Sequence, residues 1–134
     1  MEQVTIKIRT TQTVDGQQER MKTLAHGELT ATDHTYVLTY DLTDDSGEVT
    51  HTTLTVDKAG KQAIMVGNGT MIIEPNKLHT APYRMGPYEM ELGVRGKAVL
   101  CRLTAKGGNL KLQYDLIING TPVSENTVEL FVES

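Results

Sequence analysis

Apolar and polar residues alternate with a period of two along most of this chain. The alternation is clearest in residues 4–9 (VTIKIR), 36–42 (YVLTYDL) and 110–116 (LKLQYDL). Because successive side chains of a β-strand point to opposite faces, each run predicts a strand with one apolar and one solvated face. No window of a dozen residues has the i, i+3, i+4, i+7 apolar spacing of an amphipathic helix. The pattern therefore predicts an all-β protein.

Turn-forming pairs separate the alternating runs. Asp15-Gly16, Asn68-Gly69 and Asn119-Gly120 are examples, and such pairs tolerate the positive φ angles that tight hairpins require. Some of the resulting segments are expected to merge across a bulge, which leaves eight to ten strands. The segments are 3–14, 20–31, 35–43, 48–57, 61–67, 70–74, 77–84, 87–93, 97–106, 109–119 and 122–133.

Short connections between successive strands favour antiparallel pairing. A long antiparallel meander with one apolar face has to hide both that face and its edges, and closure into a barrel does both. We therefore predict a closed up-and-down barrel forming a single domain over residues 1–134. By parity, the apolar face of this barrel should include Ile64, Val66 and Tyr88 as well as the longer aliphatic runs.

Composition and charge then narrow the function classes. The formal charge of −4 and the scattered lysines and arginines argue against nucleic acid as a partner, since such binding depends on cations that neutralise phosphates. No segment approaches the 18 or more apolar residues of a membrane span. The first residues lack the basic and apolar segments of a signal peptide, and the single cysteine, Cys101, permits no intrachain disulfide. We expect a cytoplasmic protein.

Dispersed residues resemble the YwiB-like proteins, a family of small bacterial proteins that carry a domain of unknown function. The resemblance rests on Gly27-Glu28-Leu29, on the block Met71-Ile72-Ile73-Glu74, on His79-Thr80-Ala81-Pro82-Tyr83 with Gly86 and Met90, and on Gly108-Asn109-Leu110 with Tyr114-Asp115-Leu116. It implies a lipocalin-like, or calycin, barrel and brings no established activity with it.

Two positions depart from that family pattern. An Arg-x-Gly often precedes the Met block in the family, whereas residues 67–69 are Gly-Asn-Gly here. His79 stands where an aromatic residue is usual. If the family arginine belongs to a site, that site is altered in this chain.

The sequence offers no catalytic constellation, so we expect a non-enzymatic protein. Glu89 and Glu91 share a face with each other, and the alternation places that face in water. None of the four histidines has a partner at the short spacing that metal ligands usually show, and we predict neither a metal nor a cofactor. His79 is the one histidine that would suit an axial heme ligand.

The inside of the barrel is the remaining candidate site. Tyrosine and methionine side chains fall on the apolar parity, where they are either plain core or the lining of a cavity for a small, partly apolar or amphipathic ligand. The candidate ligand-binding residues are Tyr36, Tyr40, Met71, Tyr88, Met90 and Tyr114.

An interaction module is the alternative hypothesis. Pro82, Tyr83 and Arg84 combine a rigid residue with two types that are enriched at binding hot spots. On either hypothesis the protein is a monomer or a homodimer, and the sequence names neither the ligand nor the partner.

Overall fold

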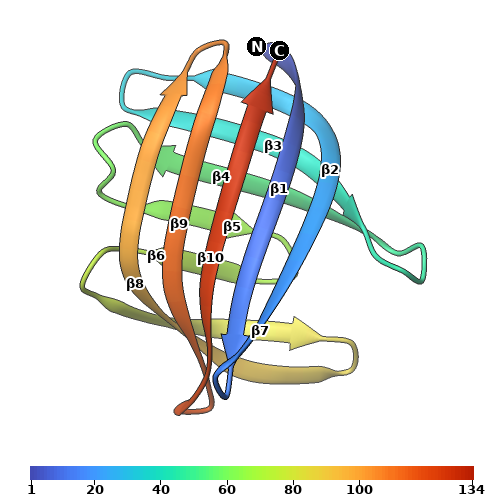
Figure 1. Ribbon diagram of the computed structural model, residues 1–134, viewed down its shortest axis with the longest axis vertical. Coiled ribbons are helices and arrows are strands. Elements are labelled where there is room, and N and C mark those ends of the chain that lie inside the picture. Colours follow the sequence, from blue (N-terminus) through green and yellow to red (C-terminus); the bar gives the residue numbers. More distant parts are fainter.

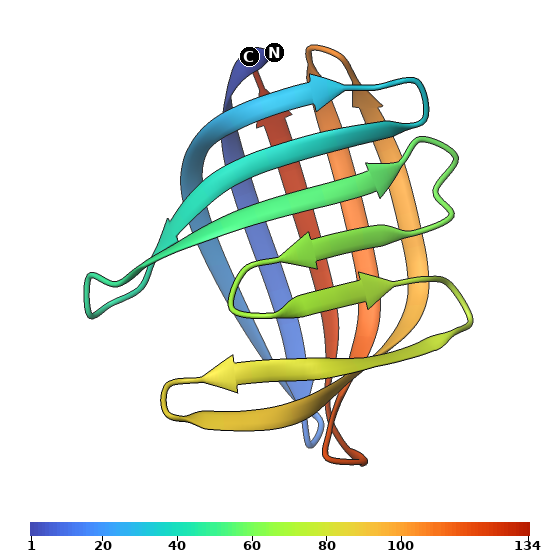
Figure 2. The same ribbon diagram turned by 180° about the vertical axis from the view of Figure 1, so that it is seen from behind.

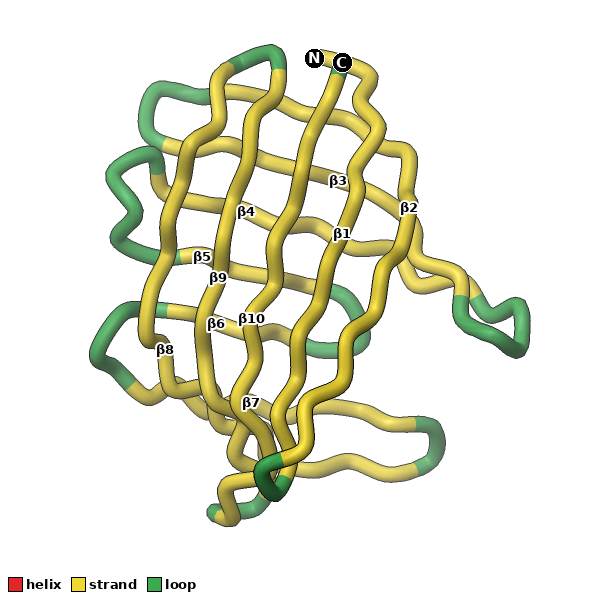
Figure 3. Tube along the Cα trace, in the orientation of Figure 1, coloured by secondary structure: helices red, strands yellow, loops and turns green.

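Ten β-strands make up the computed structural model, which describes all 134 residues apart from the side chain of Met85. The described residues form no helix, and therefore no helix long and apolar enough to cross a membrane (Figure 3). The strands are β1 (Glu2–Val14), β2 (Gln17–Ala31), β3 (Thr35–Thr43), β4 (Val49–Asp57), β5 (Ala63–Val66), β6 (Thr70–Ile73), β7 (Leu78–Met85), β8 (Tyr88–Thr104), β9 (Gly107–Ile118) and β10 (Thr121–Glu133).

All ten strands belong to one antiparallel sheet in the order β6-β5-β4-β3-β2-β1-β10-β9-β8-β7. Every neighbouring pair except β1 with β10 is also consecutive in the chain, so the fold is an up-and-down meander. In Figure 1 the strands β8, β9, β10, β1 and β2 form the near wall, and β3 to β7 cross behind it. Figure 2 shows that far wall from its own side. The predicted meander and strand number are confirmed.

The sheet curls until its two end strands, β6 and β7, approach each other. An isolated bridge joins Gly69 to Tyr83, and the turn after β6 bonds directly to β8. The amide of Asn76 donates to the carbonyl of Gly96, and the amide of Gly96 donates to the carbonyl of Lys77, both at 3.0 Å. The barrel is therefore nearly closed.

Gly96 permits this closure because the chain has no room for a side chain there. A Cβ at position 96 would lie 2.2 Å from the carbonyl oxygen of Glu74. The register of β8 against β9 also shifts between Gly96 and Ala98, which marks a β-bulge. Two predicted segments, 87–93 and 97–106, consequently merge into the single long strand β8.

The core fills the space between the two walls. Its fully buried aliphatic members come from eight different strands, and most of the predicted parity is confirmed. They are Ile6, Leu29, Leu38, Leu54, Val56, Ile73, Val94, Leu110, Leu112 and Leu130.

Two parts of the parity prediction are wrong. In β5 the inward residues are Ala63 and Met65, because they stand opposite the core residues Val56 and Leu54 of β4. Ile64 and Val66 therefore face outward. Tyr88 begins β8 beside the tight turn at Gly86, and its side chain is 73% exposed.

Candidate functional site

One side of the barrel wall opens where β2 separates from β3. The two strands pair only over Gly27–Ala31 and Tyr36–Tyr40, so the N-terminal half of β2 pairs with β1 alone. Gly27 lies at the point of separation, and a Cβ there would lie 2.0 Å from the carbonyl oxygen of Thr39. The absence of a side chain at position 27 thus lets the strands cross closely just before they diverge.

The gap leads into a hollow of about 300 Å³ that we term the barrel mouth. Five larger side chains from five strands line it: Met21, Leu42, Met65, Met71 and Tyr83. The remaining lining includes the threonines of β2, β3 and β4, the Gly67–Gly69 turn and Asp44. Flexible thioethers, one phenol and several hydroxyls give this wall a mixed apolar and hydrogen-bonding character.

Two buried phenols lie near the mouth. Burial raises the pKa of Tyr40 to about 12. Burial also raises the pKa of Tyr114 to about 12, with a further contribution from the neighbouring phenols of Tyr40 and Tyr83. Both hydroxyls are therefore neutral hydrogen-bonding groups at physiological pH.

Other buried polar groups stand beside these phenols. Thr52 is paired with Tyr40 across β3 and β4, and Asn126 is paired with Tyr114 across β9 and β10. The amide of Asn126 donates to the hydroxyl of Ser124 at 2.9 Å. The inner wall in this half of the barrel is thus polar as well as apolar.

The predicted ligand-binding residues divide into three groups. Met71 lines the mouth, and Tyr40 and Tyr114 are buried near it. Tyr36 packs at the edge of the core, with the ammonium of Lys58 4.9 Å from its ring centre.

Tyr88 and Met90 do not belong to this constellation. The exposed Tyr88 is a correction to the predicted site, since its side chain does not enter the barrel. Met90 is half-buried and lines a separate shallow hollow with residues of β7.

The predicted interaction residues lie on the β7–β8 hairpin. Pro82 and Arg84 are exposed, whereas Tyr83 is half-buried and packs against the core. Tyr83 is therefore a residue of the mouth as well as of the hairpin.

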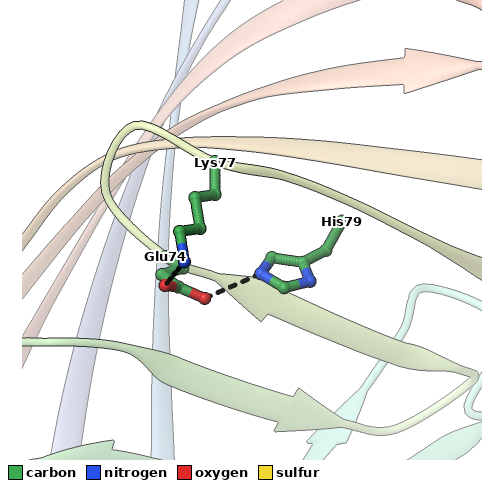
Figure 4. Close-up of polar contacts among 3 residues, drawn as sticks. All are labelled: Glu74, Lys77 and His79. Carbon is green, nitrogen blue, oxygen red and sulfur yellow. Dashed lines mark hydrogen bonds and ion pairs between the residues drawn. The ribbon is translucent and has the colours of Figure 1, made fainter.

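Three polar residues gather at the turn between β6 and β7 (Figure 4). Glu74 Oε1 lies 2.9 Å from Nε2 of His79, and Glu74 Oε2 lies 3.0 Å from Nζ of Lys77. These two partners hold the pKa of Glu74 below its usual value, with the His79 hydrogen bond as the largest cause. Through this contact with Glu74, His79 stabilises the turn that closes the barrel.

Metal-binding geometry is not found in the described part of the chain. No group of three or more His, Cys, Asp and Glu side chains there is placed to hold an ion.

Sequence reasoning missed Met21, Leu42 and Met65 as site residues. The alternation places Leu42 on the apolar face without marking it as a site residue, and the wrong phase for β5 turns Met65 outward. Met21 is 62% exposed, and only the separation of β2 from β3 makes it part of a site. No local sequence pattern signals that separation except the glycine at position 27.

Comparison with known proteins agrees with the fold. The chain resembles the crystal structure of the ywiB protein from Bacillus subtilis with a TM-score of 0.86 and 18% sequence identity, over 98% of this chain and 91% of that one. No curated protein matches. The family model described as "Domain of unknown function (DUF1934)" matches residues 6–130. The chain therefore belongs to the DUF1934 family, whose function is unknown.

Proposed function

We propose that this protein is a non-enzymatic, cytoplasmic binding protein that holds a small, partly apolar molecule in the barrel mouth. The observation that supports the proposal is the hollow itself, which is about 300 Å³ and is lined by Met21, Leu42, Met65, Met71 and Tyr83. This volume is at the lower end of the range for small-molecule sites. Methionine-rich walls adapt to irregular apolar guests.

The residues that line the mouth also favour a neutral or cationic ligand over an anionic one. Asp44 is the one charged residue in the described lining, and its carboxylate accepts hydrogen bonds from Ser46 and Glu48 in its own turn. The buried phenols near the mouth remain protonated. An anionic guest would meet a carboxylate and no cation. A neutral or cationic molecule with an apolar body and a hydrogen-bonding group is the class that this lining supports best.

Native mass spectrometry of protein purified without refolding tests the proposal. We expect a co-purifying small molecule, and we expect the neutral dye N-phenyl-1-naphthylamine to bind the emptied protein with a rise in fluorescence. The variant Met71→Trp fills the mouth and should weaken dye binding roughly tenfold, which corresponds to about 1.4 kcal/mol.

Leu100→Trp is the matched control, because Leu100 lies on the outer face of β8 and is 52% exposed. It should leave dye binding unchanged. Equal affinities for the Met71→Trp variant and the parent protein would contradict the proposal.

A second candidate function is protein–protein interaction through the β7–β8 hairpin. The exposure of Pro82 and Arg84 supports it, and the half-burial of Tyr83 weakens it. A homodimer that is lost in an Arg84→Glu variant, measured by light scattering, would favour this alternative.

A further inference from the structure

The near wall of the barrel gathers cations that are dispersed in the sequence. Six of the thirteen lysines and arginines point outward from β2, β1, β9 and β8, in three successive rows of the sheet. We term this surface the basic face. Its cations are Lys7, Arg9, Arg20, Lys22, Arg102 and Lys111.

The register of the strands fixes the arrangement of this face. Lys7 stands directly between Leu24 of β2 and Phe131 of β10, and in the next row Arg9 stands beside Lys22. Residues two apart on one strand are roughly 6.5–7 Å apart, and residues opposite each other on neighbouring strands are roughly 5 Å apart. Lys7, Arg9, Arg20 and Lys22 therefore form a continuous track on β1 and β2. Lys111 and Arg102 extend it on β9 and β8, beyond Glu129 of β10.

None of these cations forms an ion pair within the described part of the chain. The ion pairs of the described residues involve Lys77, Lys97 and two histidines, all outside the basic face. Glu129 is the one carboxylate among the three rows, and the guanidinium of Arg9 lies 5.5 Å from the ring centre of Phe131. Since the whole chain carries −4, the rest of its surface is strongly acidic.

The face is also hollowed. A recess of about 360 Å³ lies among Leu24, Lys7 and Phe131. Arg9 and Lys22 stand beside it. Leu24 is 59% exposed, so the recess offers apolar surface next to unpaired positive charge. A recess accepts a flat apolar group from a partner, whereas a membrane-binding face presents protruding apolar side chains to the bilayer.

Against the expectation from the scattered cations of the sequence, which the register of the strands brings onto one wall, we propose that the basic face binds single-stranded nucleic acid. Phosphates would lie along the cation track, and a base would enter the recess against Phe131 and the Arg9 guanidinium. A duplex is disfavoured because this wall has no helix or projecting ribbon that could enter a groove. The acidic remainder of the molecule repels the rest of the strand, so the binding is weak and strongly dependent on salt.

Fluorescence polarisation with a fluorescein-labelled 20-nucleotide oligothymidylate tests this inference on the full chain. We expect binding in 50 mM salt and a linear fall of log K with log salt. Engagement of four to six phosphates gives a slope of roughly −3 to −4. The double variant Lys7→Glu, Arg9→Glu should weaken binding at least tenfold and make the slope shallower.

The matched control is Lys61→Glu, Lys106→Glu, which changes the net charge equally at two exposed positions outside the basic face. It should keep most of the binding, and both double variants should retain their unfolding temperature and their dye binding in the mouth. The absence of oligonucleotide binding in 50 mM salt overturns the inference, as does an equal loss in both double variants. Equal affinity for a polyglutamate peptide, or for vesicles containing 30% phosphatidylserine, also overturns it and assigns the face to acidic proteins or to membranes.

Discussion

The two ends of the barrel interior differ in chemistry, although the same strands build both. On β3 the inward side chain Leu38 is followed, two residues later, by the inward side chain Tyr40. On β9 the inward side chain Leu112 is followed in the same way by Tyr114. The same change from aliphatic to polar occurs from Leu54 to Thr52 on β4, and from Val128 to Asn126 on β10. The changes pair across β3 and β4 as Tyr40–Thr52 and across β9 and β10 as Tyr114–Asn126, and the phenol of Tyr40 neighbours that of Tyr114 inside the barrel.

This contrast indicates that the two ends of the barrel interior have different roles. The aliphatic end excludes water and supplies stabilisation that is proportional to the apolar area it buries. The polar end gives up part of that stabilisation, because it buries polar groups in place of aliphatic ones and its wall is open at the mouth. The aliphatic end stabilises the barrel, and the polar end carries the candidate binding site. The site therefore lies on a rigid scaffold.

The largest expected effect comes from removing a side chain at the aliphatic end. Leu54 has no exposed surface, so Leu54→Ala should lower the free energy of unfolding by about 2–5 kcal/mol. Met71→Ala at the mouth should cost less than about 1 kcal/mol, because Met71 is only partly buried and water can fill the space it leaves. Urea denaturation with an unchanged m-value measures both variants. Equal losses would show that the two ends are packed alike.

A smaller effect should show how far water penetrates through the mouth. The pKa of about 12 for Tyr40 and Tyr114 lies above the ordinary value of 10.0, so the folded state holds these two protons more tightly than the unfolded chain. Stability is therefore unaffected below pH 10 and falls as the pH rises from about 10 to 12. Absorbance at 295 nm should show these two of the five tyrosines ionising about two pH units above the ordinary value. Ionisation of all five near pH 10 would mean that water reaches the inner phenols.

The polar and apolar alternation was enough to predict the meander, the antiparallel pairing and the aliphatic end of the core. It failed in β5, a strand of four residues in which either phase places two apolar side chains inside. It also failed for Tyr88, since a turn residue follows hairpin geometry rather than the parity of the strand it begins. Only the pairing of β5 with Leu54 and Val56 of β4 resolves the first ambiguity.

The candidate site was predictable only in part, for a different reason. Tyr40, Met71 and Tyr114 were recognised because they share the parity of the core. Met21 could not be recognised, since its role depends on where β2 leaves β3, which is a property of the closed sheet. The basic face was hidden in the same way, because its cations come from four strands and become neighbours only through the register.

The smallest expected effect concerns the turn that joins β6 to β7 and closes the barrel. Hydrogen bonds from His79 and Lys77 hold the pKa of Glu74 below its ordinary value of 4.5, so the carboxylate contributes stability at neutral pH. That contribution is lost as the pH falls through the lowered pKa, because the folded state then takes up the proton that the unfolded chain has already bound. Glu74→Gln should therefore unfold at a slightly lower temperature than the parent protein at pH 7, and the difference should shrink as the pH is lowered from 4.5 to 3. Glu89→Gln removes an exposed carboxylate of the β7–β8 hairpin and should leave the unfolding temperature unchanged at both pH values. A difference between parent and Glu74→Gln that was as large at pH 3 as at pH 7 would mean that Glu74 acts through its packing rather than through its charge.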